Sequence, residues 1–197
     1  VVDTAGVVKR KIDYSTTKDG QQLKPFMPSD KSQIVFIGDD LYIPQTVNLR
    51  LGDKAIERSP IKVVLDTIEN TSEALPMRFP PLINYKDFGT VGAFGAEYSF
   101  CYDGNRFIYS FDADEDLYLT TSAHEKVEKK KAKSKYIDHV TVFRSTEGNF
   151  QKMVRAQCEH ASYGKILYDK YRDVYYRFVY PPCDTSDYFG DYVELLR

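Results

Sequence analysis

One pattern, an aromatic strand, a polar turn and a second aromatic strand, occurs three times in this chain at a constant spacing. The three copies are "IVFIGDDLYIP" (34–44), "YDGNRFIYSF" (102–111) and "YDKYRDVYYRF" (168–178). Tyr42, Tyr109 and Tyr176 follow the turn at equivalent places, and 67 residues separate each from the next. Self-similarity at a fixed long period is typical of stacked structural units. The pattern therefore predicts a repeated β-hairpin.

A second, more charged hairpin is predicted within each period. Its copies are "VVDTAGVVKRKIDY" (1–14), "IKVVLDTIENTSEALPMRF" (61–79) and "LYLTTSAHEKVEKKKAKS" (117–134). An aromatic hairpin followed by a charged one gives four antiparallel strands. Lysines at 9, 11 and 129–131 suit an outer strand, since sheet edges are protected by charge. The Glu and Lys content of residues 123–135 also fits a solvated helix, which stays open as an alternative.

Sheets of four antiparallel strands repeated along a chain predict an all-β fold, a β-propeller. We expect a half blade at about 1–15, blades at about 33–80 and 96–144, and a partial blade at about 153–197. A propeller closes as a ring of typically four to eight blades. The sequence, with about three blades that begin and end mid-blade, is therefore expected to be a segment of a longer protein.

Charge and composition argue against several functions. The formal net charge of −2 over 197 residues gives no basic surface for nucleic acid. No apolar run approaches the ~20 residues of a membrane helix, so a membrane contact is expected only through a lipid anchor outside this sequence. The three cysteines have no metal-ligand spacing; free thiols or a Cys158–Cys183 disulfide are both open. No nucleophile motif is present, so no catalytic residue and no cofactor are predicted.

The ligand-binding candidates lie in four long loops, at 18–31, 45–60, 80–95 and 179–191, which we expect to share one face. These loops bring together aromatic rings and a cation, a mixture suited to stacking on a sugar or gripping a peptide. The candidates are Arg50, Tyr85, Phe88, Phe94, Tyr180 and Tyr188.

Acidic residues occur in two settings. Asp39, Asp103 and Asp169 fall in the tight turns of the aromatic hairpins, where Asp supports turn geometry. The run "DADED" (112–116) is the densest acidic cluster. Asp112, Asp114 and Asp116 could bind calcium, since carboxylates on loops suit hard cations, or could form a solvated acidic turn.

Three segments carry a resemblance to a known family: "FIYSFDADEDLYLTT" (107–121), "KAKSKYID" (131–138) and "YGKILYDKYRDVYYRFVYP" (163–181). They resemble uncharacterised envelope proteins of Bacteroidetes-type bacteria, a domain of unknown function whose members are often lipoproteins with a six-bladed, TolB-like propeller. The resemblance implies export to the periplasm or the outer-membrane surface. It implies no activity.

Two functions from different classes follow as hypotheses. The first is a non-enzymatic binding module of the cell envelope that takes a protein or a glycan at its loop face. The alternative is a metal-assisted carbohydrate hydrolase or lyase on a propeller scaffold. A purely structural role within a larger chain is a third possibility, because fold alone does not fix function.

Overall fold

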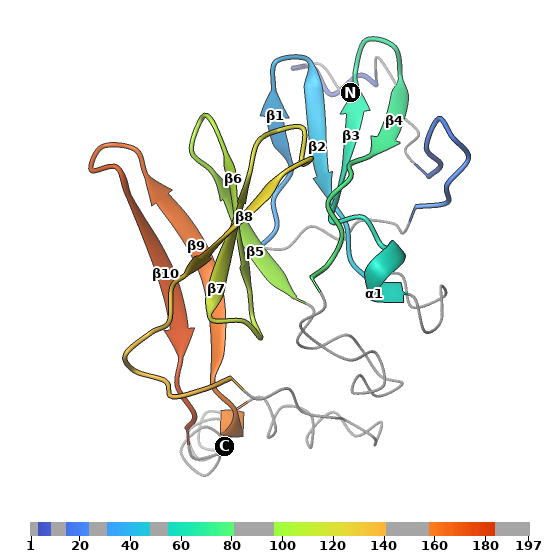
Figure 1. Cartoon of the computed structure of the whole chain (residues 1–197). Helices are drawn as coiled ribbons and strands as arrows, with labels where there is room; N and C mark the ends of the chain where they lie inside the picture. Colours follow the sequence, from blue (N-terminus) through green and yellow to red (C-terminus); the bar gives the residue numbers. More distant parts are fainter. Residues whose placement is uncertain are drawn as a thin grey trace, which may run out of the picture.

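The computed structural model describes residues 4–8, 15–23, 31–47, 55–80, 97–140 and 158–183. These residues form an all-β arrangement of two four-stranded antiparallel sheets and one two-stranded hairpin. Figure 1 shows the three units side by side in chain order, with the hairpin at one end. The predicted pairing of an aromatic hairpin with a charged hairpin is confirmed for both four-stranded sheets.

Each four-stranded sheet is a simple meander, with its strands side by side in chain order. The first sheet contains β1 (Val35–Ile37), β2 (Asp40–Pro44), β3 (Lys62–Asp66) and β4 (Thr71–Ala74), with helix α1 (Ala55–Arg58) between β2 and β3. The second sheet contains β5 (Tyr98–Tyr102), β6 (Phe107–Phe111), β7 (Asp116–Thr120) and β8 (Val127–Lys131). The hairpin contains β9 (Ser162–Asp169) and β10 (Val174–Tyr180).

Aspartates shape the turns, as the sequence predicts. Asp103 Oδ1 accepts hydrogen bonds from the backbone N–H groups of Asn105 and Arg106, at 2.8 and 2.6 Å. Gly104 follows with a φ of 97°, a left-handed conformation that favours glycine. Asp169 Oδ1 binds the Tyr171 N–H in the same way at 2.9 Å. These carboxylates are therefore turn-forming groups, which leaves their hairpins at fixed register.

An aromatic core lies between the first and second sheets. From the first sheet, Tyr42 packs on Phe107 with ring centroids 5.3 Å apart. From the second sheet, Tyr98 contacts Tyr109 at 5.8 Å and Phe111 at 5.7 Å. Phe107, Tyr109 and Phe111 are at most 1% exposed. Pleated strands bury wide aromatic faces well, so the high Tyr and Phe content has its physical use here.

The three repeated tyrosines occupy the same register position but point in different directions. Each lies in the third residue pair from its turn, opposite Val35, Phe100 and Leu167 respectively. Tyr42 faces forward onto the second sheet, whereas Tyr109 faces back toward the first. Tyr176 lies on the outer face of β10 and is 51% exposed. The 67-residue spacing therefore identifies the hairpins correctly but not the side of the sheet on which each tyrosine packs.

The contact between the second sheet and the hairpin is smaller and more polar. Ile108, Leu119 and Ile166 form its apolar centre. Ser99 Oγ accepts a hydrogen bond from the Ile166 N–H at 3.1 Å. Serines on this face leave room for close approach of the hairpin backbone, while the aromatic rings of β5 and β6 occupy the opposite face. Alternation along the strand thus gives one sheet two different surfaces.

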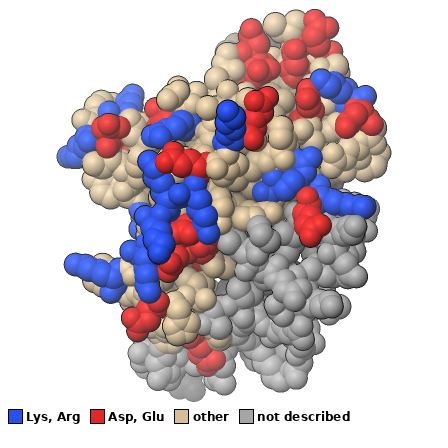
Figure 2. All heavy atoms as spheres, in the orientation of Figure 1, with Lys and Arg blue, Asp and Glu red and all other residues tan. Residues whose placement is uncertain are grey.

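Residues 127–131 form strand β8, so the helical alternative for residues 123–135 is wrong. Every residue of β8 is exposed, and β8 is the outer strand of its sheet. Its three consecutive lysines at 129–131 occupy that edge, as predicted from edge protection. In Figure 2, Lys and Arg side chains gather where β8 crosses the molecule, with acidic side chains among them. In the first sheet, residues 16 and 18 instead hydrogen-bond β4 at Ser72.

Candidate functional site

Most of the predicted ligand-binding residues fall outside the described part of the chain. Arg50, Tyr85, Phe88, Phe94 and Tyr188 are in this group. Tyr180 is described: it ends β10, is 49% exposed and lies close over Gly164 of the neighbouring strand. Its ring belongs to the outer face of the hairpin. The predicted aromatic loop face therefore stays a prediction.

The acidic loop between β6 and β7 is neutralised by neighbouring cations. Asp112 binds Lys31 Nζ at 2.8 Å, and Asp116 binds Lys129 Nζ at 2.8 Å. The third carboxylate, of Asp114, accepts the Tyr118 hydroxyl at 2.6 Å. Asp114 and Asp116 are each only 8% exposed, so this is a packed loop and not the solvated turn considered from the sequence. Among the described residues, no group of three or more His, Cys, Asp and Glu is arranged to hold a metal ion.

Arg177 of β10 holds the same loop from the other side. Its guanidinium donates to the carbonyl oxygens of Glu115, at 2.7 Å, and Asp114, and to Ser110 Oγ, at 2.8 Å. It also stacks over the Tyr163 ring, 3.5 Å from the centroid. Arginine suits this position because its planar fork carries five donors. Arg177 is thus a structural residue that sequence reasoning missed, although the "YYRF" strand that contains it was noted.

Burial also shifts the protonation of this loop. Burial raises the pKa of Asp112 to about 6, and the nearby Lys31 ammonium only partly offsets this effect. For Lys31, burial acts to lower the pKa, but Asp112 and Glu97 outweigh it and raise the value to about 12. The two directions disagree about whether the pair favours ionisation. Asp112 decides, because its side chain is 14% exposed against 26% for Lys31 and so loses more hydration.

Two ionisable side chains are enclosed within the aromatic core and were not predicted. Lys62 is fully buried, and its Nζ lies 3.3 Å from the centroid of the Phe100 ring with no hydrogen-bond partner among the described residues. His124 is 1% exposed; its Nε2 contacts the Tyr109 hydroxyl at 2.5 Å and its Nδ1 contacts the Ser122 carbonyl at 2.8 Å. Burial lowers the pKa of His124 to about 4. The neutral ring therefore donates from Nδ1 and accepts at Nε2.

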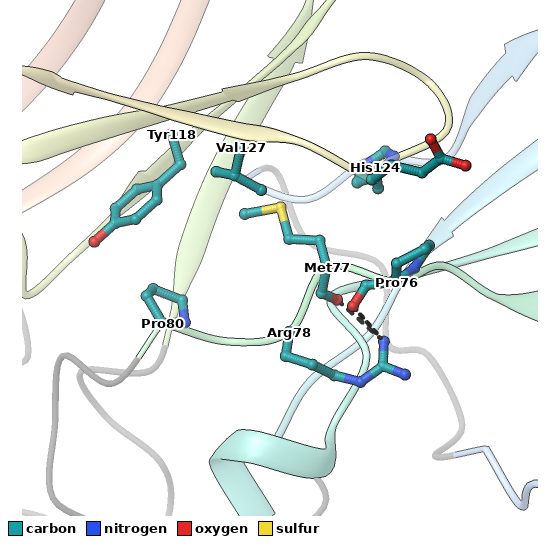
Figure 3. Close-up of a pocket in the computed structure, with 8 residues that line it drawn as sticks. Pro76, Met77, Arg78, Pro80, Tyr118, His124 and Val127 are labelled. Carbon is teal, nitrogen blue, oxygen red and sulfur yellow. Dashed lines mark hydrogen bonds between the residues drawn. The ribbon is translucent and has the colours of Figure 1, made fainter.

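A cleft of 240 Å³ lies between the chain that leaves β4 and the β7–β8 hairpin. Figure 3 shows Tyr118 and Val127 on one wall and Pro76, Met77 and Pro80 on the other, with the Met77 side chain directed toward Val127. The remaining lining residues are Arg78, His124 and Glu125. Val127 is 42% exposed, so the cleft opens at the β8 edge.

Three of the cleft's polar side chains already have partners within the protein. Arg78 donates to the carbonyl oxygens of Leu75 and Pro76, the latter at 3.0 Å. The Tyr118 hydroxyl is held by Asp114, and both His124 nitrogens are engaged as described above. The surface that the cleft presents is therefore mainly apolar, with the exposed Glu125 at its rim. Such a surface binds by contact and water exclusion, without a positioned acid, base or nucleophile.

A comparison with known proteins places the chain in a family. A crystal structure of a member of the DUF4221 family from Bacteroides vulgatus is similar, with a TM-score of 0.73 and 21% sequence identity. The match covers 92% of this chain and 50% of that one, so the chain spans about half the length of this relative. No curated protein matches. A family model described as a domain of unknown function, DUF4221, matches residues 1–191, and the chain therefore belongs to the DUF4221 family.

Proposed function

We propose that this chain is part of a non-enzymatic binding module of the bacterial cell envelope. Its cleft between residues 76–80 and the β7–β8 hairpin would receive an apolar side chain of a partner protein. The observation that carries the proposal is the apolar lining of the cleft, in which Arg78, Tyr118 and His124 are bonded internally. What the cleft offers a partner is contact area, not chemistry.

The scaffold of this module is a six-bladed, TolB-like β-propeller. Support comes from two consecutive sheets of identical strand order, packed face to face, and from a hairpin that repeats the aromatic pattern. Aromatic side chains on the outer face of β10, including Phe178 at 49% exposure, suit a further sheet of the same kind. The relative from Bacteroides vulgatus, twice as long as the matched region, has the length that such a ring needs.

A protein side chain fits the cleft better than a glycan. Sugars are recognised by stacking combined with hydrogen bonds to many hydroxyl groups, and here three of the polar side chains have partners already. The volume of 240 Å³ is below the ~300–1,000 Å³ of drug-sized ligand pockets, so it suits one or two side chains. The Glu125 carboxylate at the rim favours a basic residue beside the inserted apolar one. Export to the periplasm or the outer-membrane surface, with a lipid anchor, completes the proposal.

The test compares two variants on arrays of short peptides and of glycans. Val127→Glu puts a charge at the mouth of the cleft, while Ile68→Glu, at a position 63% exposed in the β3–β4 turn, is the matched control. The peptide array carries single Leu, Met, Phe or Tyr residues flanked by Lys or by Glu. We expect apolar peptides with basic flanks to bind the wild type and the Ile68 variant, and to lose at least tenfold in affinity with Val127→Glu.

Other outcomes would overturn the proposal. Equal peptide binding by both variants would remove the cleft from the site, and binding to glycans alone would replace the protein partner. Thermal denaturation with EDTA, calcium, zinc or manganese tests the alternative function, because ligands of the folded state raise Tm. A metal-dependent rise together with glycan cleavage would establish a hydrolase or lyase.

A further inference from the structure

Two of the three cysteines lie next to each other at the open end of the β9–β10 hairpin. Cys158 begins the short turn that leads into β9, and Cys183 follows β10 after two prolines. The Cys183 N–H donates to the Cys158 carbonyl oxygen at 2.8 Å, which closes the hairpin at its base. Both residues reach the surface, Cys183 more fully than Cys158.

The backbone geometry suits a covalent link. Residues joined by a backbone hydrogen bond between antiparallel segments have Cα atoms about 5.5 Å apart. Disulfides form across Cα separations of about 4.4–6.8 Å, so no backbone movement is needed. The side chains also approach each other: burial, and then a hydrogen bond from the Cys183 thiol, raise the pKa of Cys158. The two thiols are therefore already in contact in the reduced state.

The hairpin is the unit of this fold that gains most from such a link. In the described residues it has two strands, while each neighbouring sheet has four. Two-stranded hairpins are marginally stable by themselves. The register also shifts between Arg177 and Val179, and the outer face of β10 is exposed. A covalent closure at 158 and 183 would hold the strand ends together beyond this irregularity.

We propose that Cys158 and Cys183 form a disulfide that closes the β9–β10 hairpin. The oxidant is a disulfide compound, such as oxidised glutathione or an oxidised dithiol protein. The Cys183 thiolate, at the more exposed position, attacks one sulfur of the oxidant and expels the first thiol. The Cys158 thiolate then attacks Cys183 Sγ in the mixed disulfide and expels the second thiol. Two protons leave the cysteines and two thiols are formed, so atoms and electrons balance.

Cys101 provides an internal control. It packs between the second sheet and the hairpin, against Ile108, Leu119 and Ile166, and it is not near a second cysteine in the described residues. The proposal thus predicts that one thiol of the three stays reduced. It does not depend on the binding role of the cleft, because the link concerns the hairpin alone.

The experiment incubates the purified protein with oxidised glutathione, removes the reagent and counts thiols in denaturant. We expect the count to fall from three to one, and peptide mapping to show Cys158 joined to Cys183 with the loss of two hydrogen atoms. Reduction should then lower Tm by about 5–10 °C, the amount expected for a loop of this length in a chain of this size. Cys101→Ser should keep this reductant-sensitive Tm, whereas Cys183→Ser should lack it.

Three results would overturn the proposal. Three thiols could remain after oxidation, glutathione could stay attached to Cys183 without the second step, or the mapped link could include Cys101. Because thiol counting on the wild type is sufficient, an unstable variant does not block the test.

Discussion

Replacing Lys62 by Met should make the protein more stable at neutral pH and remove part of its pH dependence. The Lys62 Nζ is enclosed by Phe100, Phe107 and Tyr109, at 3.3, 4.8 and 5.5 Å from their ring centroids. These ring faces favour the ammonium by about 0.5–2 kcal/mol. Burying a cation without a hydrogen-bond partner costs several kcal/mol, which is more. Burial therefore wins, and the pKa of Lys62 lies well below its ordinary value of 10.5.

The sign of the pH effect follows from proton binding. Below pH 10.5 the unfolded chain carries a proton on Lys62 that the folded chain does not, so the free energy of unfolding rises with pH. The slope is up to about 1.4 kcal/mol per pH unit, and it ends at the folded-state pKa on the acid side and near 10.5 on the alkaline side. Methionine has a similar length, packs well on aromatic rings and carries no charge. We expect Lys62→Met to raise the free energy of unfolding at pH 7 by about 1–3 kcal/mol.

The assay is urea denaturation of the wild type and Lys62→Met between pH 6 and pH 10. The exposed Lys133→Met is the control for the loss of a lysine. The difference between the wild type and Lys62→Met should shrink as pH rises, and Lys133→Met should follow the wild type. If that difference is constant with pH, Lys62 is protonated in the folded protein and the ring contacts outweigh desolvation. The reasoning above would then be refuted.

Two further predictions concern the loop between β6 and β7. Because the pKa of Asp112 is raised from 3.8 to about 6, the folded state holds its proton longer; its contribution to the free energy of unfolding should fall by about 3 kcal/mol as pH rises from 4 to 6. Asp112→Asn should lack this decrease in urea denaturation at both pH values, and an unchanged pH profile would contradict the raised pKa. Arg177→Lys keeps the charge but loses most donors to Glu115, Asp114 and Ser110, so it should lower the free energy of unfolding by about 2–4 kcal/mol. Arg172→Lys, at a side chain 73% exposed, is its control, and equal stability of the two variants would show that the Arg177 hydrogen bonds are not needed.

The strand arrangement was predictable because its signals are local. Turn aspartates, alternating aromatic residues and a lysine-rich edge each act within a few residues, and each gave the correct element. The strand at 127–131 illustrates the limit of propensity: Glu and Lys favour a helix, but pairing of all five residues with β7 decides for a strand. Tertiary pairing is a contact between distant segments, and composition carries no record of it.

The candidate site was less predictable, since it depends on which side of each strand a residue faces. Lys62 looked like one of the charges of an outer hairpin, yet it points into the aromatic core. His124 lies in a segment that looked solvated, and Tyr109 together with a left-handed φ of 55° encloses it. The acidic loop was noticed for its charge, but its partner Arg177 lies more than sixty residues away in the sequence.

The difference between Tyr42 and Tyr109 shows why a repeat predicts strands better than surfaces. If stacked sheets followed a strict rotation, equivalent residues would face the same neighbour. Here Tyr42 and Tyr109 face each other across one interface, so the forward side of the second sheet carries Ile108 and Ser110 in place of an aromatic ring. That change lets Arg177 reach Ser110 and the carbonyl groups beyond it. A one-residue change of face, invisible in the spacing, thus turns an aromatic interface into a polar one and decides how the hairpin packs.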